Sequence, residues 1–358
     1  MILDVVKILL PAVLAFLIGI GITPVVTDYL YKNKMWKKKV KSVTIDGREA
    51  TVFMSLHKDK EVNTPRLGGV IIWASAFITA FMFWFLAKIL NLEEFASLEF
   101  ISRNQTWIPF FTLLLGALVG LIDDVMEIRG SSDNKIGGLS SKKRLFFVGL
   151  VALAIAVWFY VKLDISQIFL PFFGYIDLGL IFIPFFILTM LFIYAGGVID
   201  GIDGLAGGVF TVAFASYGII AFSNNQIDLA AFCALIVGSI LSFLWFNIPP
   251  ARFYMSETGS MALTITLTTV ALMTDKLGDG VGLFVLPIIA LPLVLTVLSV
   301  MIQLASKKLR GGKKIFHSTP IHHHFEALGW PSYKVTMRYW IFSVIAGALG
   351  VIVSILIQ

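Results

Sequence analysis

The chain has 358 residues, of which 58% are hydrophobic and only 14% are charged. A typical soluble domain carries about 25% charged residues, and the mean hydropathy of +0.90 points the same way. This composition argues against a soluble enzyme, a nucleic-acid-binding module and a disordered scaffold. The single cysteine, Cys233, leaves no disulfide framework and no cysteine metal site.

Ten apolar segments predict ten membrane-spanning helices, because each is close to the roughly 20 residues that cross a bilayer. The first segment is long and has no small-residue cleavage site, so we expect it to be retained. We therefore predict an all-α polytopic membrane protein with one integral-membrane domain over residues 1–358. The predicted spans, in chain order, are 5–27, 67–90, 107–122, 145–163, 177–196, 208–223, 229–246, 260–275, 282–305 and 336–357.

The basic residues predict the orientation of these spans. Ten spans place both termini on one side and divide the connecting segments into two alternating sets. One set, together with Arg338, holds 23 of the 28 Lys and Arg residues. The other set is short and mostly acidic. The positive-inside rule makes the basic set cytoplasmic and both termini external, and the net charge of +6 then reports topology and no nucleic-acid partner.

Residues 39–54 are the one soluble-looking insert. Two runs rich in β-forming residues flank Asp46-Gly47, a pair typical of a tight hairpin turn. We expect a cytoplasmic β-hairpin with a structural role.

Two acidic motifs lie at the predicted cytoplasmic face. Asp123 and Asp124 follow directly on an apolar run, at a helix C-terminus whose dipole disfavours carboxylates unless a cation or proton compensates. In GGVIDGIDGLAGG, six glycines surround Asp200 and Asp203. Glycines allow close backbone approach to a ligand, and the lack of Lys and Arg excludes a P-loop.

Two further segments on this face carry candidate ligand-binding side chains. Trp245 to Ser260 offers Asn247, Arg252, Tyr254 and Glu257, the last at the mouth of an apolar span where an unpaired carboxylate is costly. Further on, Thr319 is predicted to cap a short helix that begins at Pro320 and ends near Gly329.

That short helix would carry His322, His323 and His324 in its first turn, where free N–H groups bind anions. Successive helical residues point about 100° apart, so the three imidazoles are not expected to share one metal. Carboxylates for a divalent metal, histidines at an anion site and glycine-rich backbone together favour phosphoryl transfer. The expected donor is a cytoplasmic diphosphate, and the expected acceptor is bound in the membrane.

These residues resemble the polyprenyl-phosphate N-acetylhexosamine-1-phosphate transferases, and among them the phospho-N-acetylmuramoyl-pentapeptide transferases. The most specific match runs from His317 through Arg338 and includes PIHHHFE followed by GWP. The other matching motifs follow in the family's order along nearly the whole chain: TPRLGG at 64–69, DD at 123–124, GLS at 138–140, DGIDGLA at 200–206, WFN at 245–247 and GS at 259–260.

The resemblance implies a reaction and a setting. Phospho-N-acetylmuramoyl-pentapeptide would pass from its UDP carrier to undecaprenyl phosphate, giving lipid I and UMP in peptidoglycan synthesis. The enzyme would need Mg²⁺, would lie in the bacterial inner membrane with its active site on the cytoplasmic face, and would be a homodimer.

The resemblance also implies roles for particular residues. Asp123 and Asp124 would be the catalytic acid pair, with Glu257 completing the Mg²⁺ ligands. His322 and His323 would act at the diphosphate as catalytic residues, and His324 would bind substrate beside them. Asp200, Asp203, Asn247 and Tyr254 would surround the uridine, while Lys60 and Lys135 would supply substrate-binding lysines.

Several positions depart from the family pattern. Glu257 stands where the MGDxGS motif has aspartate, Gly197 replaces an asparagine donor, and neither Lys60 nor Lys135 is at the usual lysine position. DDVMEIR and TPRLGG favour the alternative of a relative that moves GlcNAc-1-phosphate from a UDP-sugar to a polyprenyl phosphate. A catalytically inactive relative is a second alternative. A transporter is a third, although charges at one face and no internal repeat argue against it.

Overall fold

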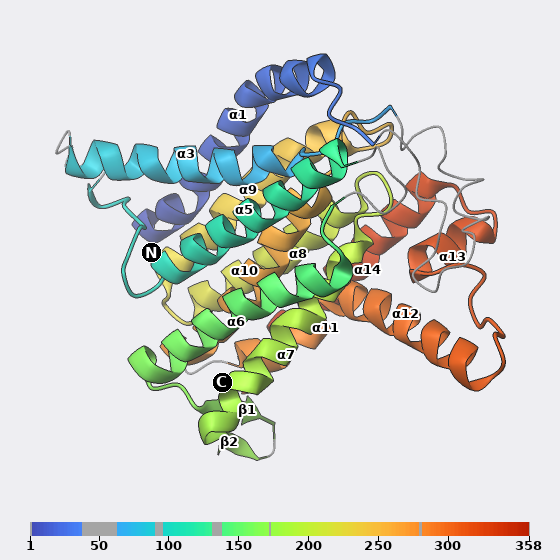
Figure 1. Cartoon of the computed structure of the whole chain (residues 1–358). Coiled ribbons are helices and arrows are strands. Elements are labelled where there is room, and N and C mark those ends of the chain that lie inside the picture. The colour runs from blue at the N-terminus through green and yellow to red at the C-terminus, as the bar shows by residue number, and fades with distance from the viewer. Residues whose placement is uncertain are drawn as a thin grey trace.

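The structure, a computed structural model, describes residues 2–37, 63–89, 96–130, 138–171, 173–278 and 281–357. Helices form nearly all of this part of the chain (Figure 1). The elements are α1 (Ile2–Lys32), α3 (Gly69–Lys88), α5 (Trp107–Arg129), α6 (Ser141–Leu163), β1 (Gln167–Leu170), β2 (Gly174–Asp177), η1 (Gly179–Ile181), α7 (Phe182–Ala195), η2 (Gly196–Ile199), α8 (Leu205–Ser223), α9 (Ile227–Asn247), α10 (Ser256–Gly278), α11 (Gly282–Ile289), α12 (Leu291–Leu309), α13 (Ile321–Ala327) and α14 (Ser332–Ile357).

Within these residues, nine helices are long and apolar enough to cross a membrane. The predicted all-α polytopic membrane protein is therefore confirmed. The predicted span 260–275 falls on α10, which is not among the nine. Its many threonines, such as Thr264 and Thr268, bond back to carbonyls of their own helix, and the helix lies in the interior of the bundle.

The predicted single span 282–305 is wrong in one respect, because the structure divides it into α11 and α12. The break falls at Ala290, between Pro287 and Pro292. Proline lacks the backbone N–H and fixes φ, so two prolines this close favour a helix end followed by a new helix start. Figure 1 shows α12 leaving the bundle at an angle to its neighbours.

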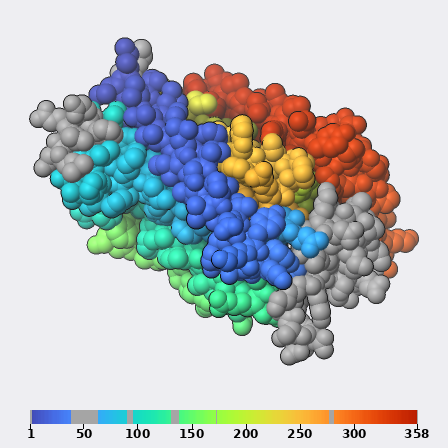
Figure 2. All heavy atoms as spheres, turned by 90° about the horizontal axis from the view of Figure 1, so that it is seen from above, coloured from blue at the N-terminus to red at the C-terminus, as the bar shows by residue number. Residues whose placement is uncertain are grey.

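Helix α10 occupies the centre of the bundle and packs against α5, α3, α7, α8 and α11. Helix α1 lies on the outside, beside α3 and α9, and Figure 2 shows it running across the surface between them. The consequence is that the first turn of α10 is surrounded by other helices at one end of the bundle.

Both termini lie at the opposite end of the bundle from that turn (Figure 1). Near the start of α1, Lys7 pairs with Asp228 at 2.7 Å, whereas near its end the Tyr31 hydroxyl donates to the Arg252 carbonyl. Helix α14 begins at the same end of the bundle as Arg252. The Thr336 hydroxyl near its start donates to the Asp203 carbonyl, and the Asp203 carboxylate accepts from the N–H of Ala251, the residue before Arg252. The placement of both termini on one side of the membrane and their external orientation stay predictions.

The described strands form an antiparallel hairpin between α6 and α7, with Gln167 opposite Asp177 and Leu170 opposite Gly174. The hairpin predicted at 39–54 lies outside the described residues.

Candidate active site

The first turn of α10 is capped by two of the predicted site carboxylates. Asp124 on α5 accepts from the backbone N–H of Thr258 at 2.8 Å and of Glu257 at 3.4 Å. Asp200, just after η2, accepts from the N–H of Ser256 at 2.8 Å. The first N–H groups of a helix have no partner within the helix, and the dipole there favours negative charge. The capping contacts therefore bring DD, DGIDG and MSETGS to one place.

Two glycines let the neighbouring helices approach this turn closely. A Cβ on Gly120 of α5 would lie 2.3 Å from the Glu257 carbonyl oxygen, and one on Gly69 of α3 would lie 2.3 Å from the Gly259 nitrogen. Both contacts are with backbone, which has no side-chain rotamer to adjust. The site is thus held at the meeting of three helices.

Ser256 begins α10 with a φ of +59°. Glycine adopts this left-handed conformation without a steric penalty, and a residue with a Cβ does not. The family motif MGDxGS carries glycine at this position. The structure therefore explains the family's glycine and shows that this chain accepts serine there under strain.

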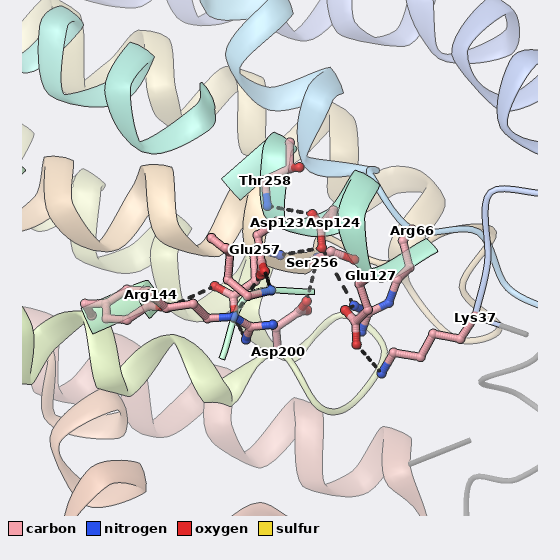
Figure 3. A network of polar contacts seen from close by, with 12 residues as sticks. Lys37, Arg66, Asp123, Asp124, Glu127, Arg144, Asp200, Ser256, Glu257 and Thr258 are labelled. Atoms are coloured by element: carbon pink, nitrogen blue, oxygen red, sulfur yellow. Dashed lines mark hydrogen bonds and ion pairs between the residues drawn. The ribbon is translucent and has the colours of Figure 1, made fainter. Parts of the chain in front are cut away.

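Two arginines each bridge a pair of acids around the same turn (Figure 3). Arg66 bonds to Glu127 and lies 3.7 Å from Asp124. Arg144 on α6 lies 2.8 Å from Asp123 and 2.6 Å from Glu257. A buried carboxylate is costly unless it is paired, so these guanidinium groups allow a cluster of acids to exist where α5 meets α10.

Asp123 and Glu257 each contact Arg144 through one carboxylate oxygen, and the other oxygen of each has a separate hydrogen-bond donor. The Leu139 N–H donates to Asp123 Oδ1 at 2.5 Å, and the Tyr194 hydroxyl lies 3.4 Å from Glu257 Oε2. These contacts fix both carboxylates independently of the arginine.

The glycine-rich turn is fastened by Asn247 and Asp203. The Asn247 side chain accepts from the Gly204 N–H at 3.0 Å and donates to the Phe253 carbonyl at 2.7 Å. The Asp203 carboxylate accepts from the Ala251 N–H at 3.2 Å. Both predicted uridine-binding residues therefore hold the loops of the site together in this structure.

His322 and His323, on α13, converge on Gly201 in the glycine-rich turn. A Cβ built on Gly201 would lie 2.7 Å from His322 Nε2 and 2.8 Å from His323 Nε2. Nδ1 of His323 lies 2.7 Å from Glu326, whose other oxygen accepts from the Ser332 hydroxyl at 2.6 Å. A carboxylate on one ring nitrogen orients the imidazole and leaves Nε2 directed at Gly201.

His324 points elsewhere. Its ring stacks on His317 with centroids 5.4 Å apart, and burial, with the neighbouring His317, lowers the pKa of the His324 imidazole. The divergence agrees with the 100° step predicted for successive histidines. The predicted cap is wrong, because α13 begins at Ile321 after an extended Pro320, so Thr319 lies outside the helix.

The histidine segment is held by the polar face of α12. Gln303 accepts from the N–H groups of Ile315 and Phe316 and donates to the Phe316 carbonyl. Ser299 accepts from the Ile321 N–H at 3.1 Å. The angled course of α12 thereby positions α13 over the site.

Tyr254 contributes to the site through its backbone. The backbone of Tyr254 pairs with Pro65 and Gly68, which holds the TPRLGG loop beside α10. Lys60 and Lys135 lie outside the described residues. Burial raises the pKa of the Asp200 carboxyl to about 6.

Arg66, Glu127 and Arg144 are site residues that were not predicted. Glu127 had a signal, since it follows Asp123 and Asp124 at the i+4 and i+3 spacings that share a helix face. Arg66 lies within the TPRLGG motif. Nothing in the sequence separates Arg144 from the neighbouring lysines that the positive-inside rule already explains.

The carboxylates of the site suit a hard divalent cation whose coordination is completed by a substrate. In the described part of the chain, no three His, Cys, Asp or Glu side chains form a ready-made metal cage. However, Asp123 and Glu257 already share one cationic group, the Arg144 guanidinium. Mg²⁺ is commonly held by one or two carboxylates together with substrate phosphates, so Asp123 and Glu257, with Asp124 beside them, fit that ion.

Comparison with known proteins gives matches along nearly the whole chain. The family model of glycosyl transferase family 4 matches residues 106–275. A phospho-N-acetylmuramoyl-pentapeptide-transferase of Listeria innocua serovar 6a is 34% identical over 347 residues, covering 95% of this chain and 96% of that protein. Similar proteins of the same printed name occur in Geobacillus sp. strain WCH70, 30% identical and covering 97% of both chains, and in Listeria monocytogenes serotype 4b, 32% identical and covering 95% of this chain and 96% of that one.

Proposed function

This chain belongs to the phospho-N-acetylmuramoyl-pentapeptide transferase family, and from that membership we propose that it transfers phospho-N-acetylmuramoyl-pentapeptide from UDP to undecaprenyl phosphate. The products are lipid I and UMP, and the reaction belongs to peptidoglycan synthesis. The observation that carries the proposal is that Asp124 and Asp200 meet at the first turn of α10, while His322 and His323 converge on Gly201, the residue after Asp200. The setting is the bacterial inner membrane, with this end of the bundle towards the cytoplasm.

The reaction forms a bond between an oxygen of the acceptor phosphate and the phosphorus attached to the sugar. The bond from that phosphorus to the UMP oxygen breaks, and UMP leaves with the electron pair. Catalysis of phosphoryl transfer consists mainly of positioning and neutralising charge. Asp123 or Asp124 orients or deprotonates the acceptor phosphate, while the Nε2 atoms of His322 and His323 meet the diphosphate above Gly201.

In this proposal the nucleotide of the donor lies near His322 and His323. Asp200, Asp203 and Asn247 build the loops that surround the uridine, and Tyr254 supplies an aromatic ring for the base. His324, Lys60 and Lys135 stay predicted substrate-binding residues.

Mg²⁺ is proposed as the cofactor, held by Asp123, Asp124 and Glu257. When bound, it would neutralise negative charge that develops on the phosphate oxygens. Glu257 replaces the family's aspartate, and its longer side chain reaches Arg144 and Tyr194 in this structure. We expect Glu257→Asp to keep or raise metal-dependent turnover and Glu257→Ala to lower it.

The protein has an apolar groove of about 420 Å³ that suits a lipid chain. The groove lies between α7, α11 and the start of α12, and α7 leads directly into the turn that carries Asp200. We propose that part of the polyprenyl chain lies there while its phosphate reaches the acids. The lining residues are Phe185, Leu188, Thr189, Phe192, Ile193, Leu283, Leu286, Pro287 and Val294.

UMP release by the full chain in detergent, with undecaprenyl phosphate and Mg²⁺, tests the proposal. UDP-N-acetylmuramoyl-pentapeptide and UDP-GlcNAc are compared as donors, each with an EDTA control. Release from the muramoyl donor alone supports the proposal, whereas release from UDP-GlcNAc alone moves the chain to glycan initiation. Absence of UMP release with both donors overturns the proposal that the chain is an active transferase. We also propose that the chain forms a homodimer. Cross-linking of two copies in membranes tests this.

A further inference from the structure

The guanidinium of Arg144 lies between carboxylates from two different helices. Its Nε is 2.8 Å from Asp123 Oδ2 on α5, and its Nη1 is 2.6 Å from Glu257 Oε1 on α10 (Figure 3). The Arg144 side chain is only 20% exposed, and it pairs with two acids, the buried Asp123 and the partly buried Glu257.

These are two of the carboxylates that the proposed function assigns to Mg²⁺. A divalent ion and a guanidinium carry charge of the same sign and seek the same oxygens, so both cannot take the shared position at once. Asp123 and Glu257 would stay in place without the arginine, because Leu139 and Tyr194 contact their second oxygens. The site thus offers a prepared pair of ligands that Arg144 covers.

We propose that Arg144 holds the place of the divalent cation and must swing away for the metal to bind, an inference that rests on the proposed function. The freed guanidinium then turns towards the donor diphosphate, where its planar fork matches phosphate oxygens. Arg144 is in this way a positioning residue that links metal loading to nucleotide binding. Arg144 lies in the first turn of α6, at the cytoplasmic end in the proposed orientation, so its long side chain has both partners within reach.

Binding of Mn²⁺, followed by electron paramagnetic resonance on the full chain in detergent, tests this without any turnover. Arg144→Gln removes the competing cation and should tighten Mn²⁺ binding at least tenfold. Arg144→Lys keeps the charge but contacts one carboxylate at a time, so its affinity should fall between the two. Arg129→Gln is the matched control, because it removes the same charge at the exposed end of α5, and its affinity should stay within twofold of the unmodified chain.

Thermal unfolding keeps the test informative if Arg144→Gln is unstable. Without divalent ions this variant leaves Asp123 and Glu257 without their guanidinium partner and should melt at a lower temperature. Millimolar Mg²⁺ should restore most of that loss and should shift the unmodified chain much less. A purely structural arginine would show a loss that Mg²⁺ does not repair.

The outcomes separate the two proposals. Equal or weaker Mn²⁺ binding by both Arg144 variants, with UMP release intact in the unmodified chain, overturns the role of Arg144 and leaves the proposed function standing. Absence of Mn²⁺ binding in every variant overturns the role of Arg144 and also the assigned metal ligands. Tight binding confined to the Arg144 variants supports the inference.

Discussion

Replacing Gly120 by alanine should disable the site through a single methyl group. The added Cβ would lie 2.3 Å from the Glu257 carbonyl oxygen, and ordinary contact begins near 3.4 Å. Helix α5 and the first turn of α10 must therefore separate by about 1 Å. The hydrogen bond from Thr258 to Asp124, now 2.8 Å, would lengthen towards 4 Å, which is beyond hydrogen-bonding range.

The expected cost follows from those contacts. Overpacking costs about 1–3 kcal/mol, and a misplacement of about 1 Å in a catalytic site lowers the rate on the order of 100-fold. UMP release and thermal unfolding in detergent measure the two effects separately. Gly149→Ala is the matched control, since a Cβ there meets nothing within 4 Å and should add up to about 1 kcal/mol of helix propensity. Activity and melting temperature of Gly120→Ala equal to those of Gly149→Ala would refute the close packing of α5 on α10.

Three further changes test other parts of the site. Ser256→Gly should raise the free energy of unfolding by about 1 kcal/mol, because it relieves the left-handed strain at φ +59°; a lower melting temperature would contradict that reading. Burial raises the pKa of Asp200 to about 6 against about 3.9 unfolded, so the folded chain bears a penalty above pH 6 that fades as the pH falls towards 4. Asp200→Asn should therefore stabilise by about 2–3 kcal/mol at pH 8 and not at pH 4, and a gain that does not vary with pH would count against it. Gln303→Leu should free the histidine segment and raise KM for the UDP donor several-fold, with little change in the apparent affinity for Mg²⁺; an unchanged KM would show that α12 does not position α13.

Much of the fold follows from the composition of the chain. A helix satisfies its own backbone hydrogen bonds, so an apolar segment of about 20 residues in a bilayer has few alternatives to a helix. Nine predicted spans accordingly fall on apolar helices in the described residues. The exceptions are the threonine-rich α10 and the break between α11 and α12, where side-chain hydroxyls and two prolines modify the pattern.

The motifs also indicated the chemistry, since acids, glycines and histidines on one side of a membrane favour transfer of a phosphorylated group. Because these motifs are far apart along the chain, the sequence does not show how they contact one another. Only the packing of α5 and α3 on α10 shows that Asp124 caps the helix carrying Glu257, and only the course of α12 brings His322 and His323 onto Gly201.

Arg144 marks the limit of the sequence most clearly. In the chain it is one basic residue beside Lys142 and Lys143, and the positive-inside rule explains all three equally. In the structure its guanidinium lies between Asp123 and Glu257, which are separated from it by 21 and 113 positions. Pairing of charges depends on distance in space, and helix packing sets that distance, so the tertiary structure alone determines which cation the buried acids hold.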